Sequence, residues 1–69
     1  MIQEKGFDIV LSSDEGYEHM CAEIFHDGQF LALISQETNQ PQIEFADRAM
    51  EFKLEEFLSV IRKAQDMLY

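Results

Sequence analysis

Apolar and polar side chains alternate along much of residues 7–45, which is typical of β-strands that bury one face. The alternation predicts four strands, over residues 7–13, 17–26, 29–36 and 42–45. Turn-forming residues separate the strands at 14–16, at Asp27-Gly28 and at 38–41. An Asp-Gly pair between two apolar runs is the strongest short-range signal for a two-residue hairpin loop.

The apolar spacing changes to the period of an α-helix near residue 54. The residues that share one helical face are Leu54, Phe57, Leu58, Ile61, Ala64, Gln65 and Leu68. Acidic residues in the first turn and basic residues in the second half suit the helix dipole. No good N-cap residue precedes this segment. Met50, Phe52 and Leu54 also alternate, which predicts a short extended segment before the helix.

A helix with a single apolar face must be covered by the sheet, because no other element is large enough. We therefore predict an α+β fold: a four-stranded antiparallel sheet, with a possible short fifth strand, and one C-terminal helix packed on one face. Sixty-nine residues make a single acidic domain, residues 1–69.

The hairpin loop at Asp27-Gly28 also predicts how the two central strands pair. The expected pairs are Phe25 with Phe30, Ile24 with Leu31, Ala22 with Leu33, and Cys21 with Ile34. Paired residues point to the same face of a sheet. The face expected under the helix is the uniformly apolar one: Met20, Ala22, Ile24, Leu31 and Leu33.

The opposite face should then hold Cys21, Glu23, Phe25, Phe30, Ala32 and Ile34. A carboxylate is costly to bury unpaired, so Glu23 indicates that this face meets solvent. An exposed apolar patch edged by charge is typical of an interaction site. A loop longer than two residues is the alternative, since it would change the register and could move these side chains into the core.

The net charge of the chain indicates which class of partner it could bind. Fourteen Asp and Glu stand against five Lys and Arg, for a net charge of −9. Such a field repels nucleic acid and anionic membranes and attracts basic proteins; the alternative is that it serves only solubility. No apolar run approaches the length of a membrane span, and residues 1–6 do not resemble a signal peptide. With the lone Cys21, these features predict a cytoplasmic protein.

Groups that could carry chemistry are sparse. His19 and His26 have no sequence-near partner resembling a triad or dyad, and Cys21 has no basic neighbour. These three residues are too few for a structural zinc site. We expect no catalytic, cofactor or metal site, and therefore no enzyme. With no basic stripe we also expect no nucleic-acid binding, although acidic mimicry of nucleic acid stays open.

Several stretches resemble the small immunity proteins of bacterial polymorphic-toxin systems, which include contact-dependent inhibition, Rhs and type VI secretion loci. The stretches are Ala22-Glu23-Ile24, Gly28, residues 30–37 (Phe-Leu-Ala-Leu-Ile-Ser-Gln-Glu), Ile43-Glu44-Phe45, and residues 54–58 with the helix that follows. The resemblance implies a cytosolic protein that occludes the active site or substrate groove of a toxin domain. A nuclease with a basic groove would fit the acidic charge.

The leading hypothesis is thus an immunity protein that binds a basic toxin domain. The alternative is a small acidic adaptor or secretion chaperone, for which we expect a homodimer through the Phe25, Phe30 and Ile34 face. The residues expected to contact the partner are Glu23, Phe25, Phe30, Ile34, Glu37 and Glu44.

Overall fold

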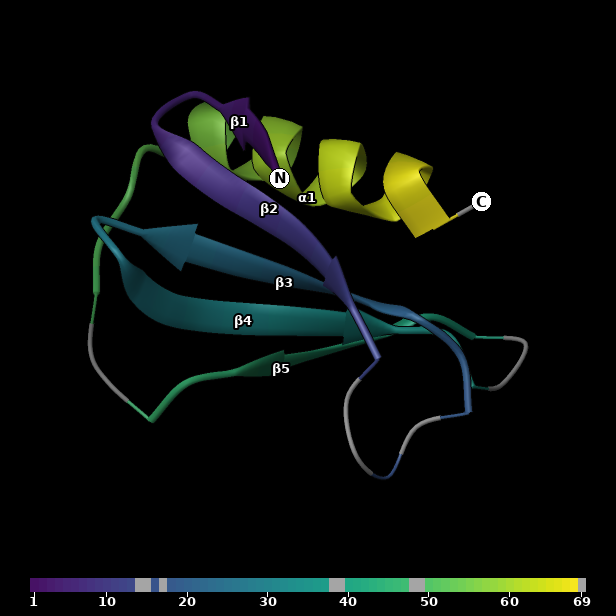
Figure 1. The fold of residues 1–69 in the computed structure, drawn as a ribbon. Helices are drawn as coiled ribbons and strands as arrows, with labels where there is room; N and C mark the ends of the chain where they lie inside the picture. The colour runs from purple at the N-terminus through teal and green to yellow at the C-terminus, as the bar shows by residue number, and fades with distance from the viewer. Residues whose placement is uncertain (14–15, 17, 38–39, 48–49, 69) are drawn as a thin grey trace.

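The structure, a computed structural model, describes residues 1–13, 16, 18–37, 40–47 and 50–68. It is a five-stranded antiparallel sheet with strand order β1-β2-β3-β4-β5 and one helix packed on one face (Figure 1). The predicted α+β fold with a C-terminal helix is therefore confirmed. The elements are β1 (Ile2–Glu4), β2 (Phe7–Ser12), β3 (Cys21–His26), β4 (Gln29–Ser35), β5 (Gln42–Phe45) and α1 (Leu54–Leu68).

The additional strand is β1, at the N-terminus, and not the segment before the helix. It pairs with β2 through a two-residue turn, Lys5-Gly6, in which both residues have positive φ (54° and 85°). Lysine is not a residue that this turn type favours, so the sequence carried little signal for it. The alternating segment that we expected before the helix forms no strand at the described residues 50–53.

The four predicted strands are present with small changes in length. The second begins at Cys21 instead of residue 17, and the others agree within one residue. Asp14, Glu15 and Tyr17 of the expected turn and strand start, and Thr38-Asn39 of the next loop, lie outside the described residues.

The hairpin between β3 and β4 has the predicted two-residue loop, but its register shifts after one pair. Asp27 and Gly28 both have positive φ (52° and 77°), and Phe25 lies opposite Phe30 as expected. The next pair is Ile24 with Ala32, so Leu31 is an extra residue on β4, a β-bulge. The predicted partners of Ile24 and Ala22 are each wrong by one residue, and Ile34, predicted opposite Cys21, pairs with Ala22.

Because of this bulge, the residues that follow it on β4 point to the opposite face of the sheet from the one predicted. Ile34 pairs with Ala22 and is buried in the core together with Ala32, so their predicted place on the uncovered face is wrong. Leu33 instead pairs with Glu23 on the uncovered face, so its predicted place under the helix is also wrong. Leu31 does lie in the core, as predicted.

The core lies between one face of the sheet and the helix. Its buried members are Phe7, Ile9, Ala22, Ile24, Leu31, Ala32, Ile34, Val60 and Ala64. The helix is rotated relative to the predicted face, because Val60 is fully buried while Leu54 is 69% exposed. Lys53 C=O accepts the first helical N–H, from Phe57 (3.0 Å), and Gln36 Nε2 donates to Leu68 C=O (3.1 Å) at the other end.

Candidate protein-binding surface

The face of the sheet opposite α1 consists of three rows of side chains, which we call the open face. The register places Gln3, Asp8, Phe25 and Phe30 in one row, and Val10, Glu23, Leu33 and Glu44 in the next. The last row holds Ser12, Cys21, Ser35 and Gln42. Four of the six residues predicted to contact a partner, Glu23, Phe25, Phe30 and Glu44, thus lie together on this face.

Carboxylates and apolar side chains are interleaved across the first two rows. Asp8 lies opposite Phe25, and Glu23 lies between Val10 and Leu33. The rings of Phe25 and Phe30 meet edge-to-face, with centroids 5.8 Å apart, and both side chains remain half-buried. The result is a small apolar surface with acidic groups set within it.

The open face carries no positive charge to balance these acids. None of the five strands, all of which are described, contains Lys or Arg. The described cations lie in the β1–β2 turn, just before α1, and on α1. Within the described part of the chain the only carboxylate within 4.0 Å of a basic side chain is that of Asp27, 3.5 Å from His26, so the acids of the open face have no cationic partner.

At one end of the open face, Glu37 links the residues after β4 to the segment that precedes β3. The Glu37 carboxylate accepts hydrogen bonds from the backbone N–H groups of Glu18 (2.5 Å) and His19 (2.9 Å). The Glu18 bond is the main reason that the pKa of Glu37 lies below its usual value. Cys21 and Ser35 in this row are buried. Glu37, predicted to contact a partner, is exposed at this end of the sheet, where it bonds to the backbone that precedes β3.

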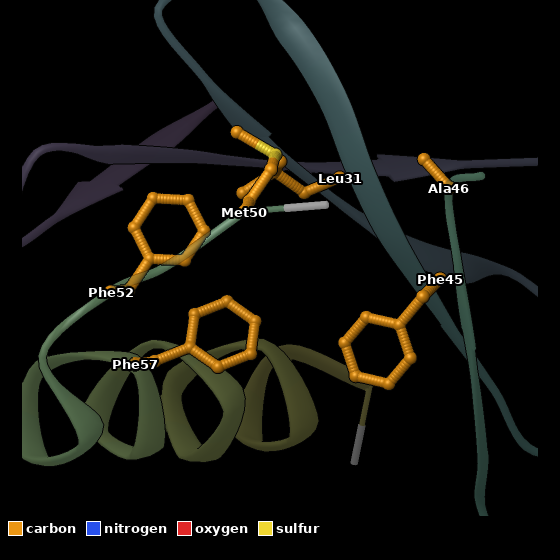
Figure 2. A pocket seen from close by; sticks show the side chains of 6 residues that line it. All are labelled: Leu31, Phe45, Ala46, Met50, Phe52 and Phe57. Carbon is orange, nitrogen blue, oxygen red and sulfur yellow. The ribbon is translucent and has the colours of Figure 1, made fainter. Parts of the chain in front are cut away.

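A second surface, which sequence reasoning missed, is an apolar groove between α1 and β5; we call it the β5 groove. The helix packs chiefly on β1, β2 and β3, so the helix side of β5 stays uncovered (Figure 1). Phe45 is 64% exposed there. One hollow of about 280 Å³ is lined by Leu31, Phe45, Ala46, Met50, Phe52 and Phe57 (Figure 2). The other, of about 210 Å³, is lined by Ile34, Pro41, Gln42, Ile43, Ile61 and Gln65.

The two histidines lie in different surroundings. His19 lies exposed in the loop before β3, and not on the sheet as we expected. His26 packs against the rings of Phe7 (4.8 Å) and Phe52 (5.1 Å) on the helix side. Among the described residues, no group of three His, Cys, Asp or Glu side chains could hold a metal ion. No helix in the described part of the chain is long and apolar enough to cross a membrane.

Comparison with protein-family models, with curated proteins and with solved structures found no match to this chain.

Proposed function

We propose that this chain is a cytoplasmic immunity protein, not an enzyme, which binds a basic toxin domain through the open face and blocks its active site. The observation that carries the proposal is the interleaving of Asp8, Glu23 and Glu44 with apolar side chains on a face without Lys or Arg. Binding to a basic surface would place each carboxylate near a cation while the half-buried rings of Phe25 and Phe30 lose their remaining contact with water.

The physical chemistry of such a face suits fast and specific neutralisation. An acidic surface steers a basic partner into encounter and raises the association rate. Aromatic side chains at the centre of an interface supply most of the binding energy once water is excluded. The net charge of −9 acts in the same direction at longer range.

Self-association through the same face is disfavoured on electrostatic grounds. Two copies meeting face to face would bring acidic groups together with no cation from the strands between them. Like charges in such an arrangement cost free energy, so a basic heterologous partner fits better than a homodimeric adaptor.

The direct test is protection of cells. The toxin domain encoded beside this chain's gene is expressed from an inducible promoter, with the chain or its Phe25→Ser/Phe30→Ser variant expressed alongside. We expect growth with the native chain and growth arrest with the variant at equal protein level. Failure of the native chain to bind or protect against any toxin domain of its own locus would overturn the proposal.

A further inference from the structure

We infer that the β5 groove binds an extended basic segment of a protein partner, which adds to the sheet as a new strand beside β5. This inference concerns a different surface from the open face and does not rest on the proposed function. It follows from three features of β5: a free backbone edge, apolar side chains that face a hollow, and flanking carboxylates.

The free backbone edge follows from the strand order, because β5 has a neighbour on one side only. Ala46 N–H donates to Leu31 C=O (2.7 Å). Hydrogen-bonded pairs alternate along an antiparallel ladder, so the backbone groups of Glu44 also point towards β4. Those of Ile43 and Phe45 therefore point outwards, where an added strand could bond to them.

The side chains of the same two residues border the groove. Phe45 lines one hollow and Ile43 the other, each facing a residue of α1: the ring of Phe45 lies 6.4 Å from that of Phe57. Phe52 stacks on Phe57 with centroids 5.6 Å apart, so the first hollow has aromatic walls (Figure 2). A strand beside β5 would direct every second side chain towards these hollows.

The helix adds apolar surface that the sheet does not cover. Leu54 and Leu58 belong to the apolar face predicted from the sequence, yet they are 69% and 38% exposed. They neighbour Phe57 and Ile61 on the helical surface, since residues three and four apart are adjacent. The apolar face of α1 is therefore wider than its contact with the sheet. The part of this face that the sheet does not cover, at Leu54 and Leu58, lies beside the groove.

The charges around the groove indicate a basic occupant. Asp47 and Glu51, beside the lining residues, are exposed, and no described Lys or Arg pairs with them. Glu44 is exposed on the opposite face of β5, where the alternate side chains of an added strand would lie. A second copy is a poor occupant, because each copy carries −9 and pairing β5 with β5 would bring acidic strands together. A segment that alternates basic and apolar residues could bond to the backbone edge of β5, fill the hollows with its apolar side chains, and place its basic side chains near the carboxylates.

The probe is a short peptide, acetylated and amidated, in which lysine alternates with valine or phenylalanine. It is titrated into the ¹⁵N-labelled chain and followed by residue-resolved NMR. We expect saturable shifts at Ile43, Phe45 and Phe57, with slower hydrogen exchange at the amides of Ile43 and Phe45. Replacing the lysines by glutamate, or N-methylating the peptide backbone, should weaken binding by about tenfold or more.

Matched variants place the site. Ile43→Pro removes an outward N–H, whereas Ile43→Ala removes much of the side chain but keeps that N–H; only the proline variant should abolish binding while the spectrum stays folded. Phe25→Ser, on the open face, should leave the peptide affinity unchanged. Shifts confined to the open face, no shifts at millimolar peptide, equal binding of the N-methylated peptide, or a β5-paired dimer of the free chain would each overturn the inference.

Discussion

Phe25 and Phe30 lie opposite each other across the β3–β4 hairpin, on the face of the sheet that the helix leaves uncovered. The bulge at Leu31 follows this pair directly and places both Leu31 and Ala32 in the core. The hairpin thus holds an aromatic pair towards solvent while it supplies consecutive residues to the core. Predictions about stability and about binding both follow from this division.

The first prediction compares the two sides of the hairpin. Ile34→Ala should lower the free energy of unfolding by about 2–4 kcal/mol, because it opens a cavity beneath the helix. Phe25→Ala should cost only about 1 kcal/mol, since it removes a half-buried ring and one edge-to-face contact. Urea unfolding of both variants measures the difference. A larger loss for Phe25→Ala would mean that the faces are assigned the wrong way round.

The second prediction concerns the rotation of the helix. Val60→Ala should cost about 1–2 kcal/mol because Val60 is fully buried against the sheet. Leu54→Ala, at the exposed start of the helix, should change stability by no more than about 0.5 kcal/mol. Thermal unfolding by circular dichroism distinguishes the two. Equal losses would indicate that Leu54 packs into the core.

The third prediction is the pH dependence of the Glu37 contact. Hydrogen bonds to the ionised carboxylate lower its pKa below the usual value of 4.5, so the contact stabilises the fold fully above 4.5 and is lost as pH falls through the lowered pKa. The amide shifts of Glu18 and His19 should follow this titration by NMR. In Glu37→Gln the titration should disappear, and a midpoint at or above 4.5 would contradict the assignment.

The fourth prediction tests the β1–β2 turn. Lys5 has a positive φ that asparagine tolerates better, and Asn-Gly is a preferred pair for this turn. Lys5→Asn should therefore stabilise the chain by about 0.5 kcal/mol, measured as a higher midpoint in urea. Lys5→Val, which disfavours positive φ, is the control and should destabilise. An unchanged midpoint in both variants would show that β1 contributes nothing to stability.

Local signals were enough to predict most of the fold. The Asp27-Gly28 loop, the helix and the four longer strands follow from turn residues and apolar spacing. The bulge does not, because residues 30–34 are all apolar and their pattern cannot say which side chains face the core. Packing against α1 determines which side chains face the core. Ile34 lies in the core and Leu33 lies on the open face, the reverse of the predicted arrangement.

The candidate surfaces were predictable to different degrees. Phe25 and Phe30 were identified because they pair next to the loop, before the register shifts. Glu23 was identified because the extra residue lies on β4 and leaves the alternation of β3 unchanged. Asp8 and Val10 join them only through the pairing of β2 with β3, which no local pattern specifies. The β5 groove depends on where the helix rests across the sheet, a tertiary feature without a signal in the sequence.

The affinity of the toxin domain of the same locus for a charge-reversed open face tests the proposed function most directly. Glu23→Lys/Glu44→Lys is compared by calorimetry with Glu55→Lys/Asp66→Lys, which changes the net charge equally on exposed positions of α1. The open-face pair should weaken binding by about 100-fold at low salt and the helix pair by less than about tenfold, with both variants folded. Equal losses in the two pairs, or an unchanged affinity of the open-face pair, would place the interface elsewhere.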